Sequence, residues 1–279
     1  MASDYSVRFW KPAPDAATEL LCASLEGSAG QPHVHEEWQF AVVETPSKLS
    51  LGAFQRYDAQ MDDVTMVHPY DVHSEAAGAG GPSKWRMLYV ASSMVSRLYG
   101  GKAPRFFRPV LTDPAAAAEL RELLRQSEEG TVAGAEFLSR VSQWLEQLLL
   151  RHAEDAVTAL PLPSVERARV YLQSHPTQSI TLPEVGAVAG VTISHLVRSF
   201  SRRVGLPPRS YHSQVRLAHA RRLLANGKSA TWVAYECGFA DQSHLSRRFK
   251  ECHGVTPGAF QAQYTAGRIR VAAGEKNAA

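Results

Sequence analysis

The chain has 279 residues, of which 44% are hydrophobic, and a formal net charge of +3. This length is enough to bury two hydrophobic cores, so we expect two domains. No run approaches the roughly 18 apolar residues that a membrane-spanning helix needs, and MASDYSVRFW lacks the basic and apolar segments of a secretory signal. The sequence therefore argues against a membrane protein and favours a cytoplasmic one.

The positive charge is concentrated in the C-terminal part of the chain. Residues 164–270 hold 15 Lys and Arg against 5 Asp and Glu, a net charge of +10, whereas residues 1–163 hold 14 against 21, a net charge of −7. This division predicts a C-terminal domain that binds a polyanion and an N-terminal domain with another task. The three cysteines lack a CxxC spacing and are odd in number, which fits neither a metal pair nor a disulfide framework.

Residues 1–110 have the sequence pattern of short β-strands. Between about residues 20 and 95, β-type runs are separated by turn residues and Gly/Pro-rich breaks: LLCASLEG, EWQFAVVETP, KLSLGAFQRY, DVTMVHPYDV and KWRMLYVASSM. Such a series is typical of a small antiparallel sandwich or barrel. The first domain is therefore predicted to be a β-structure that ends near residue 110.

Residues 111–158 have a helical pattern. An Asp-Pro pair predicts the capped start of a helix over about 113–127, and a second helix is expected over about 133–152. The apolar stripe of the second helix recurs at intervals of three and four residues and consists of Leu138, Val141, Leu145 and Leu148. This stripe either packs within its own domain or forms a homodimer seam, and we assign it to dimerisation. The following ALPLP, residues 159–163, predicts a short, stiff linker.

From residue 164 to residue 265, the chain reads as short helices separated by Gly, Pro and Asn turns. Ser164, Thr181 and Ser229 are the predicted N-caps. Helices are expected at about 164–174, 182–189, 193–204, 208–225, 230–236 and 242–252, with a shorter one after Pro257. Residues 266–279 form a tail that we expect to be disordered.

Two stretches of this C-terminal domain repeat one another. GVTISHLVRSFSRR contains an SHL triplet at 194–196, and CGFADQSHLSRRFK contains the same triplet 49 residues later, at 243–245. Each copy reads as helix, Gly turn and helix, the outline of a helix-turn-helix. In each second helix a Leu and a Phe lie four residues apart and are expected to face the core. A single basic helix is often only a solvated surface, but two copies in register favour nucleic-acid recognition.

The outer faces of the two repeated helices carry small polar groups with Arg and Gln, which suit the edges of DNA bases. The predicted base contacts are Ser194, Val197, Arg198, Gln242, Ser243, Ser246 and Arg247. The predicted phosphate contacts, which give affinity without sequence choice, are Arg202, Arg203, Arg209, Arg216, Arg248 and Lys250. A connecting helix of 18 residues is about 27 Å long. It can therefore set the two helices about one DNA turn, ~34 Å, apart.

The stretch SATWVAYECGFADQSHLSRRFK, followed by GVTP, resembles the signature of AraC/XylS-type transcriptional regulators. The resemblance covers about residues 164–265 and implies a seven-helix domain with two helix-turn-helix units that read adjacent major grooves of double-stranded promoter DNA. In this family's pattern, the base-contacting positions coincide with those given above. The resemblance also implies a homodimeric bacterial regulator that is nucleoid-associated when bound to DNA, with RNA polymerase as a candidate partner.

The N-terminal half contains two short stretches that resemble the motifs of cupins. HVHEEWQ, from His33, resembles the first motif, and PYDVHS, with His73, resembles the second. We therefore predict an α+β chain of two domains: an N-terminal cupin-like β-barrel with two following helices, and a C-terminal all-α double helix-turn-helix domain. The predicted lining of the site for a small-molecule effector is His33, His35, Trp38, Gln39 and His73.

The same histidines raise the alternative of a metal-dependent cupin enzyme that carries a DNA-binding domain. Three imidazoles on neighbouring strands could hold zinc or iron. Metal-binding cupins, however, place a Glu where this chain has Gln39, and a neutral amide is a poor ligand for a divalent ion. We therefore expect no metal, no other cofactor and no enzymatic activity, and favour a ligand-responsive transcription factor.

Overall fold

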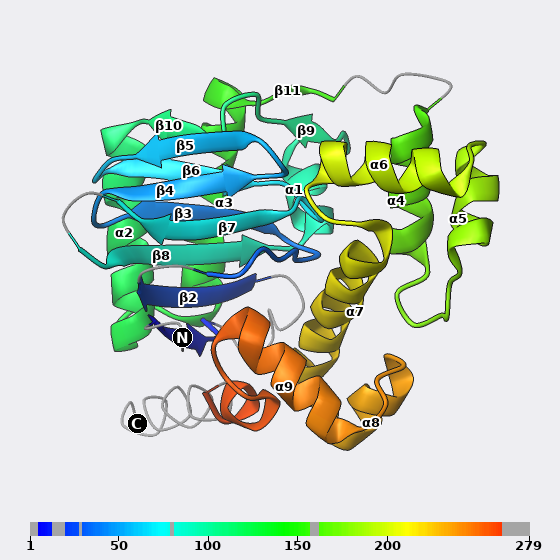
Figure 1. Ribbon diagram of the computed structural model, residues 1–279. Helices are drawn as coiled ribbons and strands as arrows, with labels where there is room; N and C mark the ends of the chain where they lie inside the picture. Colours follow the sequence, from blue (N-terminus) through cyan, green and yellow to red (C-terminus); the bar gives the residue numbers. More distant parts are fainter. Residues whose placement is uncertain (1–4, 13–19, 28–29, 79–80, 157–161, 264–279) are drawn as a thin grey trace.

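The structure is a computed structural model that describes residues 5–12, 20–27, 30–78, 81–156 and 162–263 (Figure 1). Two β-sheets form the N-terminal half, and a series of short helices forms the C-terminal half. Among the described residues, no helix combines the length and the apolar character needed to cross a membrane. The predicted linker, except for its last two residues, and the whole of the predicted tail lie outside the described ranges.

The N-terminal half is a two-sheet structure with open edges, as expected for a cupin-like sandwich but without a closed barrel. One sheet has the antiparallel order β1-β2-β8-β3-β6-β10, and the other has the order β5-β4-β7. The strands of these two sheets are β1 (Tyr5–Trp10), β2 (Leu20–Gly27), β3 (Trp38–Val43), β4 (Ser47–Leu51), β5 (Gln55–Ala59), β6 (Asp63–Val67), β7 (His73–Ala77), β8 (Ser83–Val90) and β10 (Val110–Thr112). A short pair, β9 (Pro104–Arg105) and β11 (Glu154–Asp155), lies apart from them.

The side chains of strand β3 point alternately into two different hydrophobic cores. All six of its residues are buried, and side chains alternate between the faces of a strand. Phe40 therefore packs in the core under the helices that follow the sheet. Ala41 and Val43 belong to a second core, which includes residues of the C-terminal domain. Each face of this central strand thus supports a different part of the molecule.

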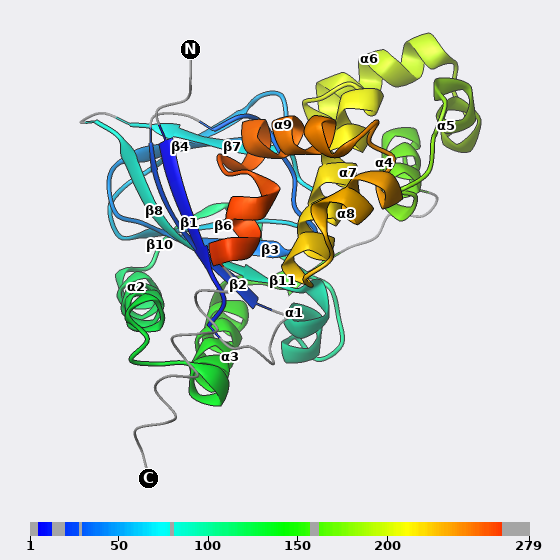
Figure 2. The same ribbon diagram turned by 90° about the horizontal axis from the view of Figure 1, so that it is seen from below.

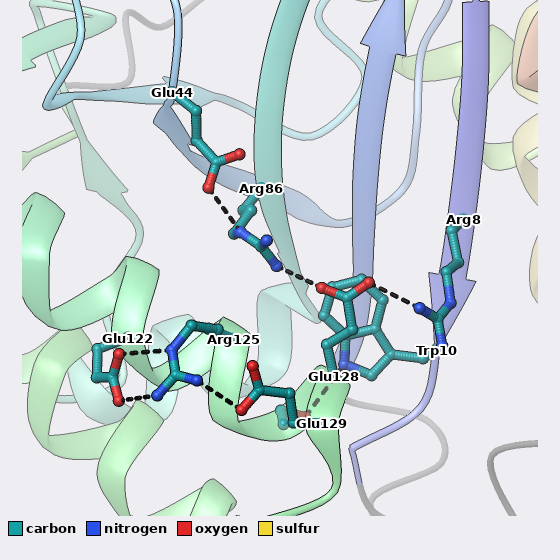
Figure 3. A network of polar contacts seen from close by, with 9 residues as sticks. Arg8, Trp10, Glu44, Arg86, Glu122, Arg125, Glu128 and Glu129 are labelled. Carbon is teal, nitrogen blue, oxygen red and sulfur yellow. Dashed lines mark hydrogen bonds and ion pairs between the residues drawn. The ribbon is translucent and has the colours of Figure 1, made fainter.

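Helices α2 (Pro114–Glu129) and α3 (Gly134–His152) cover one face of the six-stranded sheet (Figure 2). The Asp113 carboxylate accepts a hydrogen bond from the Ala116 N–H, which confirms the predicted cap. In Figure 3, the end of α2 is tied to the sheet because Glu128 accepts hydrogen bonds from Arg86 of β8 and from Arg8 of β1, the latter at 2.9 Å. Helix α1 (Ser92–Leu98), which follows β8 directly, was not expected from the sequence.

The assignment of the α3 stripe to dimerisation is wrong. Val141, Leu145 and Leu148 are fully buried within one protomer, in the same core as Phe40, and Leu138 packs partly buried against that core. The physical reason is that the sheet has an apolar face that needs a cover, and α3 supplies it. The other interpretation, packing within its own domain, is therefore the one that the structure supports.

The C-terminal half has the seven expected helices. They are α4 (Ser164–Ser174), α5 (Leu182–Ala189), α6 (Ile193–Val204), α7 (Pro208–Ala225), α8 (Ala230–Glu236), α9 (Gln242–His253) and a helical turn over residues 257–263. Thr181 and Ser229 are N-caps as predicted, and Thr181 forms a capping box with Glu184. Ser164 is instead the first residue of α4, and Pro163 occupies the cap position.

The two halves pack closely against each other through the second, sheet-facing core. Leu217 and Leu224 of α7 and Phe249 of α9 share this core with residues of the six-stranded sheet. At the end of α6, Gly205 approaches Gly52 so closely that an added Cβ would lie 2.6 Å from its carbonyl carbon. The sheet domain therefore contacts the C-terminal ends of both repeated helices, α6 and α9, as well as the helix that connects them (Figure 1).

Candidate DNA interface and sensor cluster

The two repeated helices, α6 and α9, are specified by the same local signals. The Thr192 side chain caps α6 by accepting from the His195 N–H, and the Asp241 carboxylate caps α9 by accepting from the His244 N–H at 2.7 Å. Each helix ends at a glycine in the left-handed region, where a side chain would be strained. The Leu and Phe pair of each helix, Leu196, Phe200, Leu245 and Phe249, is fully buried. The predicted core faces are therefore confirmed.

The opposite faces of α6 and α9 are open to solvent. Among the predicted base contacts, Ser194, Arg198, Gln242, Ser243 and Arg247 are exposed, and Val197 and Ser246 are half-buried. Neither Arg198 nor Arg247 has a hydrogen bond or ion pair with any residue that the structure describes. Their guanidinium groups can therefore form the paired hydrogen bonds that Arg makes with guanine.

The histidine beside each buried Leu behaves differently in the two copies. His244 packs against Phe239 and accepts a hydrogen bond from the Ala240 N–H, so it supports the turn before α9. His195 is exposed on α6. The two repeats are therefore equivalent in their core residues but not in this polar position.

The predicted phosphate contacts divide into three groups. Within the described residues, exposed side chains without an ion pair belong to Arg202, Arg203, Arg209 and Lys250. Arg248 is half-buried and pairs with Glu251 of its own helix at 2.8 Å. These groups lie on or next to the reading helices, where cations can reach the DNA backbone.

Arg216 differs from the other predicted phosphate contacts and is reassigned to a structural role. Its guanidinium donates hydrogen bonds to the carbonyl oxygens of Pro176 at 3.4 Å, Gly238 at 3.1 Å and Gln178 at 3.1 Å. Burial lowers the pKa of this side chain. Arg216 therefore joins the loop after α4 to the turn before α9, and three of the five N–H groups of its guanidinium are already used.

The N-terminal domain brings most of the predicted effector residues into one buried cluster, which we call the histidine cluster. It comprises His33, His35, Gln39, His73 and Glu75. The His73 ring centroid lies 4.2 Å from that of His33 and 4.6 Å from that of His35. Glu75 was missed in the sequence, although it shares a face of β7 with His73, two residues away. That spacing was the available signal.

Trp38 does not belong to the histidine cluster, so the prediction for this residue is wrong. It lies next to Gln39 on β3 and therefore points to the opposite face of the sheet. There it stacks with Phe40 and packs against His68 in the core under α2 and α3.

Backbone carbonyls fix the orientation of the three imidazoles. Nδ1 faces the carbonyl oxygen of Gln31 at 2.9 Å in His33, of Glu37 at 2.6 Å in His35, and of Asp71 at 3.0 Å in His73. In His33 and His73 the carbonyl only accepts, so Nδ1 donates the proton and a neutral ring has its lone pair at Nε2. Both nitrogens of His35 face acceptor oxygens. Burial lowers the pKa of His35 and lowers the pKa of His73 to about 4, so both rings are neutral at pH 7.

The remaining contacts of the histidine cluster are rich in acceptors. The Gln39 amide donates to a Glu75 carboxylate oxygen at 3.1 Å, while its own oxygen lies 3.0 Å from Nε2 of His35. Each ring nitrogen of His35 faces an acceptor oxygen, but a neutral ring has only one N–H. One of the two contacts therefore has no hydrogen. The cluster therefore attracts a positive charge more readily than a negative one.

Comparison with known proteins places these two regions in a family. A model of the AraC-like ligand binding domain matches residues 16–148, and a model of a helix-turn-helix domain matches residues 185–263. The chain belongs to the AraC family of transcriptional regulators. It is 29% identical to the uncharacterised HTH-type transcriptional regulator YbfI of Bacillus subtilis, over 76% of this chain and 80% of that one.

Other members and solved structures agree with this AraC-family assignment. The chain is 26% identical to the HTH-type transcriptional activator RhaS of Klebsiella pneumoniae, over 88% of this chain and 92% of that one. Its fold is similar to that of ToxT from Vibrio cholerae with a bound unsaturated fatty acid, with a TM-score of 0.56 and 13% identity. The match covers 95% of this chain and 97% of ToxT. The predicted two-domain fold and regulator class are therefore confirmed.

In this AraC-family regulator, the histidine cluster lies beneath the DNA-binding domain. His253, near the end of α9, has its ring centroid 6.3 Å from that of His33. The Arg221 guanidinium of α7 pairs with Glu37 and lies over the Tyr89 ring, 4.7 Å from its centroid. Groups from both domains therefore surround the cluster, and no sequence pattern indicates this proximity.

Proposed function

We propose that this protein controls transcription by placing α6 and α9 in successive major grooves of promoter DNA. The observation that carries this proposal is the pair of capped, repeated helices that bury a Leu and a Phe and leave Arg198 and Arg247 exposed and unpaired among the described residues. The high positive charge of the C-terminal half supports it. Phosphate contacts would come from Arg202, Arg203, Arg209, Arg248 and Lys250.

The same proposal includes control by an effector at the contact between the two domains. The sheet domain touches the ends of both reading helices, so a ligand that changes this contact changes how they are presented to DNA. His33, His35, Gln39 and His73 would form part of the effector site. The solved ToxT structure with an unsaturated fatty acid offers a precedent for ligand binding in a similarly folded protein.

The proposal places the protein in the cytoplasm, as a homodimer that contacts RNA polymerase, and gives it no enzymatic role. The alternative cupin enzyme would need a substrate at the histidine cluster. His35, His73 and Glu75 are between 1% and 3% exposed, and α9 lies over them. Such a closed site favours a regulatory ligand over catalytic turnover.

The test is a measurement of DNA affinity by fluorescence anisotropy, using duplexes selected from a random pool by the purified protein. We expect the selected sites to bind about 10³-fold or more tightly than scrambled duplexes. Arg247→Ala should lower this preference by about 1–3 kcal/mol, because one base contact is lost while those of α6 remain. Arg125→Ala is the matched control, because this arginine lies on α2 and pairs with Glu122. Equal affinity of the wild-type protein for selected and scrambled duplexes would contradict the proposal.

A further inference from the structure

We propose that the contact between the two domains is a binding site for a divalent transition-metal ion. His33, His73 and Glu75 are the ligands from the sheet domain, and His253 of α9 is the ligand from the DNA-binding domain. The inference deepens the proposed function by naming the class of regulatory ligand. The binding of metal to this cluster can nevertheless be measured without DNA.

The first observation is the distance between the ligand atoms. One ligand atom from each of His33, His73 and Glu75 lies within 4.8 Å of the other two. Nε2 of His73 lies 3.8 Å from the nearer carboxylate oxygen of Glu75, which is too long for a hydrogen bond. Two ligands of a tetrahedral ion such as zinc lie roughly 3.4 Å apart. A metal ion therefore fits between these groups after a small side-chain movement.

The second observation is the orientation of the imidazoles. In His33 and His73, Nδ1 donates to a backbone carbonyl, which leaves Nε2 as the nitrogen that can bind a metal, and Nε2 of His73 lies 3.8 Å from the Glu75 carboxylate. Metal-ligating histidines are held in this way, because the hydrogen bond at one nitrogen fixes the ring and keeps the other nitrogen available. Two imidazoles and a carboxylate form a donor set that suits zinc, iron(II), cobalt(II) or nickel(II).

The third observation is that two buried imidazole nitrogens have no hydrogen-bond partner among the residues that the structure describes. They are Nε2 of His73, from the sheet domain, and Nε2 of His253, from α9. Buried polar atoms are nearly always paired, so an unpaired buried nitrogen calls for a partner such as an ion or an ordered water. Both rings flank His33, since their centroids lie 4.2 Å and 6.3 Å from its own. An ion held by His33, His73 and Glu75 would satisfy the nitrogen of His73 directly, and it would satisfy that of His253 once this side chain moves closer, because His253 is not among the three ligands that lie within 4.8 Å of one another.

The charges around the histidine cluster agree with a cation. Arg221 is the nearby guanidinium, and its charge is balanced by Glu37. Metal-binding cupins have a carboxylate at the position of Gln39. In this chain Glu75 supplies the carboxylate instead, and the Gln39 amide donates a hydrogen bond to it at 3.1 Å. An anionic ligand would instead face Glu75 and the lone pairs of the imidazoles. The neutral amide at position 39, which argued against a metal in the sequence, thus has a supporting role.

The consequence of this arrangement is that the metal ion links the two domains. A ligand from α9 makes metal affinity depend on how α9 is docked, and metal binding in turn stabilises the docked position. The ion would thus act on one of the two reading helices directly, without entering the DNA interface.

The experiment uses the full chain after removal of metal with EDTA. Zinc chloride is titrated by calorimetry, and cobalt(II) is titrated in parallel by visible absorption, which reports tetrahedral coordination. We expect one ion per chain and a melting temperature that rises with zinc concentration. Glu75→Gln, which keeps the size of the side chain, and His253→Asn should each weaken zinc binding at least tenfold. His195→Asn is the matched control, because this histidine is exposed on α6.

Two different outcomes would contradict the two parts of this proposal. Absence of zinc binding by the wild-type chain, or unchanged zinc affinity in Glu75→Gln, would overturn the metal site. Unchanged affinity in His253→Asn alone would overturn the link between the domains. Circular dichroism and thermal unfolding in EDTA establish that each variant is folded. These measurements of zinc affinity and stability do not involve DNA. The metal site and the proposed DNA-binding function can therefore be disproved independently of each other.

Discussion

Replacing Arg216 by Ala should destabilise the DNA-binding domain without removing a phosphate contact. The side chain is half-buried, and its guanidinium donates three hydrogen bonds to backbone carbonyls, at 3.1 to 3.4 Å. Hydrogen bonds from charged donors contribute about 1.5–3 kcal/mol when well formed. Because these are long and partly exposed, we expect a total loss of about 2 kcal/mol. This loss corresponds to a fall of about 4–8 °C in the melting temperature of a chain of this size.

The assay combines thermal unfolding with the salt dependence of DNA affinity. Arg209→Ala is the matched control, because this residue lies on the same helix, is exposed and has no ion pair among the described residues. Loss of one phosphate contact lowers the slope of log affinity against log salt by about 0.9. We expect that change for Arg209→Ala and none for Arg216→Ala. If Arg216→Ala instead lowers the slope and leaves the melting temperature unchanged, the structural role is refuted.

Three other predictions test the packing and the buried groups. Gly205→Ala should loosen the contact between the domains and increase their proteolysis, because the added Cβ would lie 2.6 Å from backbone atoms. The control is Gly227→Ala, which is also at positive φ but would have nothing within 4 Å of its Cβ. This control should cost only about 1–2 kcal/mol of strain and leave proteolysis unchanged. Burial raises the pKa of the two cysteine thiols of the DNA-binding domain to about 12. In a Cys22→Ser background, neither should react with a thiol reagent at pH 8 until the protein is unfolded, and rapid reaction of the native protein would contradict their burial. Burial also lowers the pKa of His212. Protonation therefore favours the unfolded chain, and the free energy of unfolding should fall as the pH drops below about 6.5. This fall should be less steep in His212→Gln. If urea titrations give the same slope of unfolding free energy against pH for both proteins, the prediction is wrong.

The helices of the C-terminal domain were predictable because their start and stop signals are local. Helix α5 begins at a capping box and ends at a glycine, and α6 and α9 begin at Thr192 and Asp241, whose side chains cap them. Such signals act within one turn of the helix and depend little on tertiary packing. The observed bounds of α5 to α8 therefore agree with the sequence pattern.

The strands were harder to predict because their partners are distant in the sequence. The pattern of KLSLGAFQRY predicts a single β-type run, but Gly52 adopts a positive φ and divides it into β4 and β5. Strand β7 was missed because HSEAA has neither β-branched nor aromatic residues. Its pairing with β4 is what makes it a strand.

The candidate sites show the same limit. The motifs placed His33, His35 and His73 together correctly, since His33 forms an isolated β-bridge with His73 at the start of β7. The approach of His253 could not be foreseen, because it depends on how two domains pack. An amphipathic stripe such as that of α3 reveals an apolar face but not which surface covers it. Likewise, the sequence shows that Arg216 is basic but not that carbonyl groups surround it.

The most direct test of the central claim is a comparison of the base preferences of Arg198→Ala and Arg247→Ala, measured by sequencing the duplexes that each variant selects. If α6 and α9 lie in successive major grooves, each variant loses its preference at one short block of base pairs. The two blocks should be separated by about 10–10.5 base pairs. Loss of preference at the same base pairs in both variants, or unchanged preferences in either, would contradict the account.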